Sequence, residues 1–190
     1  MKRYFCLALA AVLLVGLPAR ADQDIDTRIK ACEACHGPQG NSTDGNFPIL
    51  AGQSARYIYI ELRDFKEGRR KNEFMSAMAA PMSKQDMLAY GEYFAAQPQR
   101  ATDFKPDPDK AALGKQKADE TLCSMCHQGG FSGSNEIPKV AGQHPQYVIK
   151  QLKDFKARVR TNDAGNMASV SSTLSETDME NIANYIATLY

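Results

Sequence analysis

The pentapeptide Cys32-Glu-Ala-Cys-His36 recurs 91 residues further along the chain as Cys123-Ser-Met-Cys-His127. In each copy two thiols stand about one helical turn apart, so both can form thioether bonds to the vinyl groups on one edge of a porphyrin. The histidine that follows then lies under the iron as an axial ligand. Two such motifs predict two covalently attached haem c groups, with His36 and His127 as iron ligands. The predicted points of attachment are Cys32, Cys35, Cys123 and Cys126.

Three other interpretations of the motif fit less well. A thioredoxin-like cysteine pair does not require a histidine beside the second cysteine, and its βαβ context is missing from this sequence. A structural zinc site needs four ligands, whereas each copy offers two cysteines and one motif histidine. A disulfide between residues three apart is geometrically awkward and leaves both histidines unexplained. Haem attachment is therefore favoured.

The rest of the chain repeats in the same order as the motifs. Pro48 and Ala51-Gly52-Gln53 recur 90 residues later as Pro138 and Ala141-Gly142-Gln143. The same offset relates six further residues in each copy, namely Tyr57, Leu62, Asp64, Phe65, Lys66 and Asn72 to Tyr147, Leu152, Asp154, Phe155, Lys156 and Asn162. Because internal repeats of this kind mark duplicated structural units, the sequence predicts two copies of one unit of about 80 residues.

Each copy has the hydrophobic pattern of a small set of helices. Helices are expected over residues 25–34 and 109–125, leading into the cysteine pairs, and after the Gly-Gln turns. A further helix is expected to begin at Ser83 and at Ser175, because Ser-x-x-Asp is typical of a capping box. No alternating strand pattern of useful length is present. The predicted fold is all-α, with the helices of each copy packed around one haem.

The first residues have the layout of a secretory signal. Lys2 and Arg3 precede an apolar run over residues 5–17, and Ala19-Arg20-Ala21 matches a signal-peptidase site. The predicted signal peptide is 1–21, which removes Cys6 and places the protein outside the cytoplasm. A proline-containing stretch, 97–110, has the composition of a semi-extended connector. The predicted domains are therefore 22–100 and 101–190.

The charge balance excludes one class of partner. The chain of 190 residues has 23 Lys and Arg against 22 Asp and Glu, a formal net charge of +1. A balance so close to zero does not suit a polybasic binder of nucleic acid or anionic lipid, so no nucleic-acid partner is expected.

The second axial ligand decides what the iron can do, and methionine is the predicted ligand in both copies. In the second copy only Met167 and Met179 follow the motif, and Met179 lies on the apolar stripe of the last helix, so Met167, in a predicted loop, is the ligand. The repeat aligns Met75 with Met167, and Met78 is the alternative. His144 aligns with Ser54 and is interpreted as an exposed loop residue.

Two His/Met sites predict an electron carrier. Iron with both axial positions filled by the protein is closed to added ligands and exchanges single electrons without rearrangement. The alternative is a dihaem redox enzyme, either a peroxidase or a thiosulfate-oxidising cytochrome, and a haem-based gas sensor is a third class. The redox enzyme and the gas sensor would each need a vacant or differently ligated iron, which the duplicated methionine disfavours.

These motifs make the sequence similar to the cytochrome c4 family. The resemblance covers the chain after the leader and is carried by residues 32–41, 47–53, 142–144 and 160–162 and by the Met-to-Leu-Ser spacing. It implies two class I cytochrome c domains related by a pseudo-two-fold axis, with haem edges close together at their interface. It also implies electron delivery from a quinol-oxidising respiratory complex to a terminal oxidase, by a protein loosely held at the membrane. The chain is expected to be a monomer.

The resemblance also suggests supporting residues around each haem. The carbonyls of Pro48 and Pro138 resemble those that accept the Nδ1 hydrogen of the ligand histidines. Asn72 and Asn162 are expected to hold the methionine loops. Tyr57 and Tyr147 are expected to hold haem propionates together with four arginines, Arg69, Arg70, Arg158 and Arg160.

Overall fold

The computed structural model describes residues 25–189, and over this range the chain forms helices and no β-strand. The all-α prediction is confirmed. The α-helices are α1 (Ile25–His36), α2 (Ala55–Lys66), α3 (Glu73–Ala79), α4 (Lys84–Ala95), α5 (Pro108–Glu120), α6 (Cys123–His127), α7 (Pro145–Lys156), α8 (Asn166–Ser172) and α9 (Glu176–Ala187). Two single 3-10 turns, η2 (Pro38–Gly40) and η3 (Gly129–Phe131), follow the two motifs.

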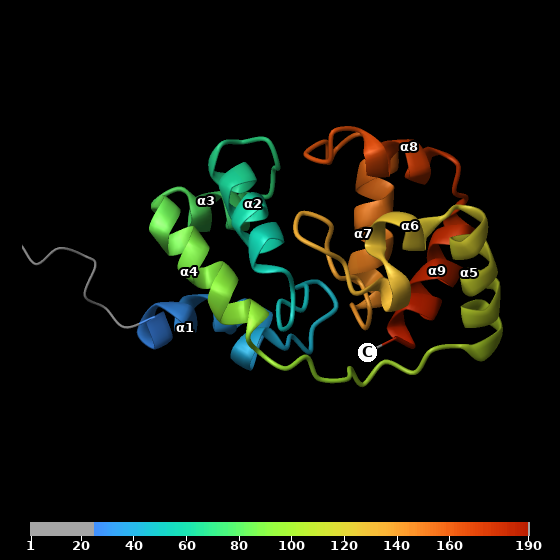
Figure 1. Ribbon diagram of the computed structural model, residues 1–190, viewed down its shortest axis with the longest axis horizontal. Helices are drawn as coiled ribbons and strands as arrows, with labels where there is room; N and C mark the ends of the chain where they lie inside the picture. Colours follow the sequence, from blue (N-terminus) through green and yellow to red (C-terminus); the bar gives the residue numbers. More distant parts are fainter. Residues whose placement is uncertain (1–24, 190) are drawn as a thin grey trace, which may run out of the picture.

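The helices form two groups that lie next to each other (Figure 1). Helices α1 to α4 make up the first half of the molecule, residues 25–96, and α5 to α9 make up the second half, residues 107–189. Residues 97–107 run between them without helix or strand along one edge of the molecule, and helix α5 begins within the predicted connector 97–110.

Each half has a hydrophobic cluster of its own. In the first half α2 packs against α4 and α3, and in the second half α9 packs against α5 and α7. The buried residues correspond between the copies, because both clusters contain the predicted stripe of the helix after the Gly-Gln turn. These residues are Ile58, Leu62 and Phe65 in α2 and Val148, Leu152 and Phe155 in α7.

Both predicted capping boxes are present. The Ser83 hydroxyl accepts a hydrogen bond from the Asp86 amide at 3.1 Å, and the Asp86 carboxylate accepts one from the Ser83 amide at 2.8 Å. Ser175 and Asp178 make the same two bonds at 3.0 and 2.8 Å. Because these bonds satisfy amides that the first helical turn leaves unpaired, α4 and α9 begin at equivalent positions.

The helix expected over residues 109–125 is interrupted. Helix α5 ends at Glu120 and α6 begins at Cys123, because Leu122 adopts a left-handed conformation with φ of 56°. In the first half, by contrast, α1 continues through the motif to His36. The second motif is therefore carried by a separate short helix. Met167 also differs from the prediction, since it lies in the first turn of α8 rather than in a loop.

The predicted signal peptide, residues 1–21, lies outside the described residues. Between residues 25 and 189 no helix combines the length and the apolar character that crossing a membrane requires.

Gly114 allows α5 and α9 to approach each other closely, which gives a test of the packing. A Cβ atom at Gly114 would lie 1.9 Å from the carbonyl oxygen of Asn181 in α9. We expect Gly114→Ala to lower the free energy of unfolding by about 1–3 kcal/mol, because the two helices must separate. Denaturant unfolding of the holoprotein measures this. Gly129→Ala is the control, since no heavy atom lies within 4 Å of the added Cβ. Equal stability of the two variants would contradict the close approach.

Candidate functional site

The two motif histidines have the same surroundings. His36 and His127 are 7 % and 8 % exposed, and the Nδ1 atom of each lies 2.9 Å from a proline carbonyl oxygen, that of Pro48 and Pro138 respectively. Because a carbonyl can only accept, Nδ1 must carry the hydrogen in both rings. Burial lowers the pKa of both histidines, although the hydrogen bond to proline opposes this. Each ring is therefore neutral and keeps the lone pair on Nε2 for a metal.

No disulfide joins the four motif cysteines. Cys32 and Cys123 are half-buried, and Cys35 and Cys126 are exposed. Burial raises the pKa of Cys32 and of Cys123, so both are protonated at neutral pH. Two reduced thiols one helical turn apart, followed by a neutral imidazole with a free Nε2, match the donor set of a covalently attached haem.

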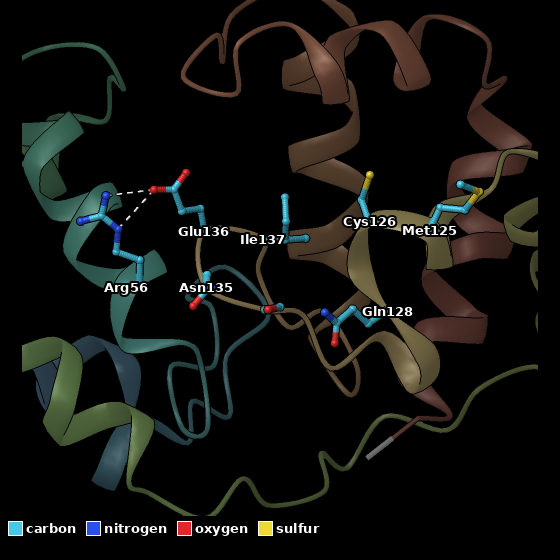
Figure 2. A pocket seen from close by; sticks show the side chains of 8 residues that line it. Arg56, Met125, Cys126, Gln128, Asn135, Glu136 and Ile137 are labelled. Atoms are coloured by element: carbon cyan, nitrogen blue, oxygen red, sulfur yellow. Dashed lines mark hydrogen bonds and ion pairs between the residues drawn. The ribbon is translucent and has the colours of Figure 1, made fainter.

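Apolar side chains next to the second motif also fit a large apolar cofactor. Met125 and Leu122 are 74 % and 59 % exposed. Cys126 and Ile137 stand on one wall of a cleft of about 720 Å³, and Arg56 of α2 stands on the opposite wall (Figure 2). Arg56 donates hydrogen bonds of 2.9 and 3.2 Å to Glu136 across this opening. Exposed apolar side chains therefore lie close to Cys126 in the sequence, and the cleft beside Cys126 is bordered by the first half.

The methionines divide into buried, half-buried and exposed groups. Met82, Met87 and Met179 are buried in the two clusters. Met75 and Met167 are half-buried at equivalent positions, in α3 and α8, where each packs against the edge of its cluster. Met78, the alternative to Met75, is 41 % exposed. Met75 and Met167 are therefore buried to a similar degree, whereas Met78 is more exposed.

The two methionine helices begin in different ways. Asn72 caps α3, where its side-chain oxygen accepts a hydrogen bond from the Met75 amide at 2.9 Å. Asn162 does not make the equivalent contact, and its amide nitrogen instead donates to Asp64 of the first half at 2.9 Å. Asp163 accepts hydrogen bonds from the amides of Gly165 and Ala168 at 3.2 and 3.0 Å. The residue that holds the Met167 segment is therefore Asp163, which the repeat alone does not reveal.

The interpretation of His144 as an exposed loop residue is wrong. His144 is only 4 % exposed, and its Nε2 atom donates to the carbonyl oxygen of Ser42 in the first half at 2.9 Å. It stands immediately before α7, at the surface between the halves. No local pattern marks it as buried, because the atoms that cover it belong to the other copy.

The tyrosines and two of the arginines meet in a buried cluster between the halves. Arg160 donates to the Tyr57 hydroxyl and Arg70 to the Tyr147 hydroxyl, both at 3.0 Å, so each arginine reaches the tyrosine of the other half. The side chains of Glu61 and Gln151 each accept from both arginines. We call Tyr57, Glu61, Arg70, Tyr147, Gln151 and Arg160 the interface cluster.

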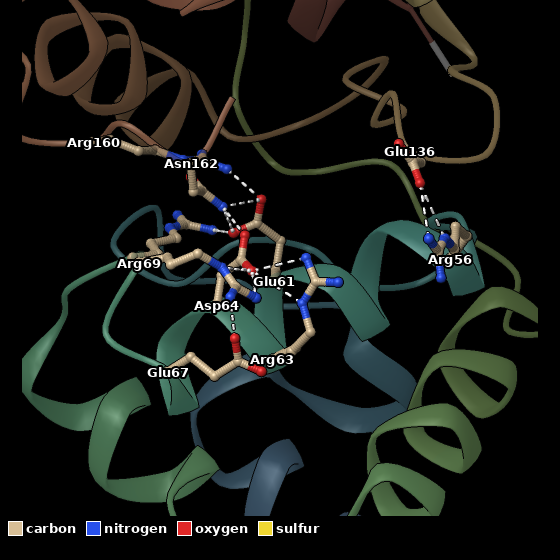
Figure 3. A network of polar contacts seen from close by, with 10 residues as sticks. Arg56, Glu61, Arg63, Asp64, Glu67, Arg69, Glu136, Arg160 and Asn162 are labelled. Atoms are coloured by element: carbon tan, nitrogen blue, oxygen red, sulfur yellow. Dashed lines mark hydrogen bonds and ion pairs between the residues drawn. The ribbon is translucent and has the colours of Figure 1, made fainter. Parts of the chain in front are cut away.

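Glu61, Gln151 and Asp64 also take part in contacts between the halves, although no sequence motif marks them as site residues. Glu61 is 8 % exposed and lies 2.5 Å from both Arg70 and Arg160. Burial by itself raises the pKa of Glu61, but the two guanidinium groups outweigh it, so its pKa is lowered. Asp64 pairs with Arg69 and Arg63 beside the interface cluster (Figure 3). The repeat offset of 90 residues, which aligns Glu61 with Gln151, is the sequence signal that could have drawn attention to this pair. Arg158 is exposed.

Comparison with known proteins identifies close relatives. A sequence profile described as cytochrome c matches residues 111–190. The chain is 35 % identical to cytochrome c4 of Pseudomonas aeruginosa over 100 % of both chains. The crystal structure of reduced recombinant cytochrome c4 from Pseudomonas stutzeri is similar with a TM-score of 0.81 and 35 % identity, covering 87 % of this chain and 97 % of that one. The chain is also 30 % identical to a thiosulfate dehydrogenase electron acceptor of Stutzerimonas stutzeri, over 95 % of this chain and 93 % of the relative.

Glu61 makes the stability of the protein depend on pH. Its pKa in the folded protein lies below the ordinary 4.5, so its contribution is complete well above pH 4.5 and is lost as the pH falls through the folded-state pKa. We expect Glu61→Gln to cost about 3 kcal/mol of unfolding free energy at pH 7, since two buried guanidinium groups lose their counter-charge. The variant should also lose less stability than the wild type as the pH falls below 4.5, because only the wild type loses the charge of Glu61 by protonation.

Denaturant unfolding of the holoprotein at several pH values measures both effects. Glu136→Gln is the matched control, because Glu136 also pairs with an arginine of the other half but is 61 % exposed. A parallel pH dependence of the wild type and Glu61→Gln would show that Glu61 is not held as the structure indicates.

Proposed function

Because the chain belongs to the cytochrome c4 family, we propose that it carries single electrons in the periplasm from a quinol-oxidising respiratory complex to a terminal oxidase. It is a dihaem electron-transfer cytochrome with covalently bound haem c, and it is not an enzyme. The observation that supports the proposed role best is that both motif histidines make the same 2.9 Å contact with a proline carbonyl. Two equivalent histidine sites suit two haems that both transfer single electrons.

Each half is proposed to hold one haem. The proposed domains are 22–100 and 101–190, and the proposed thioether links are made by Cys32 and Cys35 in the first and by Cys123 and Cys126 in the second. The proposed axial pairs are His36 with Met75 and His127 with Met167. The matching burial and helix position of the two methionines support this assignment.

The protein's part in electron transfer is to keep the ligands still. Haem c supplies a one-electron Fe(III)/Fe(II) couple when bound. Pro48 and Pro138 hold the Nδ1 hydrogens, which fixes the tautomer and the orientation of both rings. Asn72 and Asp163 fix the start of the helices that carry Met75 and Met167. Ligands held in this way would move little when the iron of a bound haem changed its oxidation state, so little reorganisation would oppose electron transfer.

The interface cluster has a charge that suits haem propionates. Glu61 supplies one negative charge to the two positive charges of Arg70 and Arg160, so one positive charge is left over. Guanidinium groups bind carboxylates in a favourable planar geometry. We therefore assign Arg70 and Arg160, with Tyr57 and Tyr147, to the side of the two sites where propionates would lie.

The proposed location follows from the predicted signal peptide. Residues 1–21 would direct export, and the mature monomer would work in the periplasm, loosely held at the membrane surface. Redox protein partners are proposed and nucleic acid is not.

A second candidate for the electron donor is a thiosulfate-oxidising enzyme. The relative of Stutzerimonas stutzeri described as a thiosulfate dehydrogenase electron acceptor is similar over almost the whole chain, so the same architecture serves that donor elsewhere. The two candidates differ in the protein that reduces this cytochrome, so the electron donor can be identified by direct kinetics.

Stopped-flow reduction of the oxidised holoprotein tests the donor. We expect a quinol-oxidising complex supplied with quinol to reduce both haems at least about tenfold faster than a thiosulfate dehydrogenase supplied with thiosulfate, since specific docking sets the association rate. Quinol alone is the control. The reverse order of rates would replace the respiratory donor by the thiosulfate-oxidising enzyme.

Substitution of the methionines tests the ligand assignment. In Met167→Ala one of the two haems should lose its far-red Met-to-iron band, bind carbon monoxide when reduced and show a lower potential, because a thioether ligand raises the potential. Met75→Ala should do the same for the other haem. Optical spectra and redox titration of the holoprotein measure these changes.

Met78→Ala is the control for the first half and should keep both far-red bands. Loss of a band in Met78→Ala together with an unchanged Met75→Ala spectrum would transfer the ligand role to Met78. Two haems per chain in mass spectrometry would still be expected for every variant.

A further inference from the structure

Gln53 and Gln143, the last residues of the two Ala-Gly-Gln segments, each reach across the interface to the backbone of one residue in the other half. Gln143 accepts a hydrogen bond from the Ile49 amide at 2.9 Å and donates one to the Ile49 carbonyl at 3.0 Å. Gln53 makes the same pair of bonds to Lys139, at 2.9 and 2.8 Å. Both glutamines are 7 % exposed.

The residues that they hold come directly after the two prolines. The Pro48 carbonyl, which accepts from His36, and the Ile49 amide, which donates to Gln143, belong to one peptide group. In the second half the Pro138 carbonyl accepts from His127, and the Lys139 amide of the same peptide group donates to Gln53. Because a peptide group is planar and rigid, each histidine ring is joined to a glutamine of the other half through a single peptide.

We propose that Gln143 is a positioning residue for His36 and that Gln53 is a positioning residue for His127, so each half tunes the iron ligand of the other. This inference rests on the proposed function, in which both histidines are axial ligands. It goes beyond it because the residue that sets the ligand strength of one haem lies in the domain that holds the other haem.

The glutamine affects the histidine through the polarity of the shared peptide. A peptide whose N–H donates to a good acceptor has a more negative carbonyl oxygen, since hydrogen bonds in a chain strengthen one another. A stronger carbonyl acceptor draws the Nδ1 hydrogen more strongly and makes Nε2 a more basic ligand. A more basic ligand stabilises oxidised iron. Removing the glutamine should therefore raise the reduction potential of the haem in the other half.

The two carboxamides are well held for this role. The side-chain oxygen of Gln143 also accepts from the His144 amide at 3.1 Å, and that of Gln53 from the Ser54 amide at 2.9 Å. Each oxygen therefore faces two N–H donors while the nitrogen faces a carbonyl, which allows only one orientation of the amide. An interface that needed adhesion alone would not require this contact to fall on the peptide that each histidine uses in both copies.

The substitutions Gln143→Met and Gln53→Met in the holoprotein test the inference, because methionine has a similar length and no hydrogen-bonding amide. The Nδ1 protons of His36 and His127 in the reduced, ¹⁵N-histidine-labelled protein are assigned through their contacts with Pro48 and Pro138. We expect Gln143→Met to move the His36 proton upfield and to leave the His127 proton unchanged, and Gln53→Met to do the opposite.

The potentials should follow the same crossed pattern. In a redox titration followed by NMR, Gln143→Met should favour reduction of the haem at Cys32 and Cys35 by about threefold, which for a one-electron couple is about 30 mV. Gln53→Met should do so for the haem at Cys123 and Cys126. Gln143→Glu, which keeps an acceptor for the Ile49 amide, should leave the His36 proton at or downfield of its wild-type position.

Gln99→Met is the matched control, because Gln99 also donates to a backbone carbonyl of the second half, that of Ala141 at 3.1 Å, but touches neither proline peptide. It should move neither proton. Three outcomes for the Nδ1 protons and the reduction potentials would each overturn the inference. They are equal shifts in both halves in every variant, shifts confined to the half that carries the substitution, and no shift at all. A wild-type spectrum without the far-red bands would instead reject the His/Met ligation on which the inference rests.

Discussion

A buried imidazole that donates its Nδ1 hydrogen to a proline carbonyl stands at the centre of each half. Burying a neutral histidine without a partner for Nδ1 would leave a polar N–H unsatisfied, at a cost of about 1–3 kcal/mol. The carbonyls of Pro48 and Pro138 remove this cost at 2.9 Å and determine which ring nitrogen is left for iron. The segment that follows each motif must therefore turn back over it, and the positive-φ glycines Gly37 and Gly133 allow the turn because a Cβ there would meet backbone atoms closer than 3 Å.

The same contact makes the two halves depend on each other. The peptide that receives the histidine hydrogen is held from the opposite half by a glutamine, and the surrounding surface repeats this exchange with tyrosines and arginines. Buried charges cost free energy unless they are paired, so the interface cluster favours one arrangement of the halves over others that would leave a guanidinium unpaired. The symmetry is broken where Glu61 aligns with Gln151. One carboxylate and one amide thus serve two arginines, and the interface cluster keeps one positive charge that no carboxylate of the cluster balances.

Much of the fold could be predicted because it is local or repeated. The capping boxes at Ser83 and Ser175 and the stripes of α2 and α7 depend on residues three or four apart, which a sequence displays directly. Other predictions failed where the partner lies far away in the chain. His144 is buried by Ser42, and Asn162 contacts Asp64, both across the interface. The break at Leu122 was also missed, because no glycine or proline marks the left-handed residue.

By itself the sequence determined the chemistry and the repeat: two Cys-x-x-Cys-His motifs, a methionine at matching positions and helices of matching register. These follow from covalent spacing and from helical periodicity, which are properties of short segments. Only the tertiary structure decided how one copy acts on the other. It placed Gln143 on the peptide beside His36, Arg160 on Tyr57 and His144 under Ser42. These contacts join residues 94 to 103 positions apart. Whether such residues meet depends on how two folded surfaces match in shape, charge and hydrogen bonding.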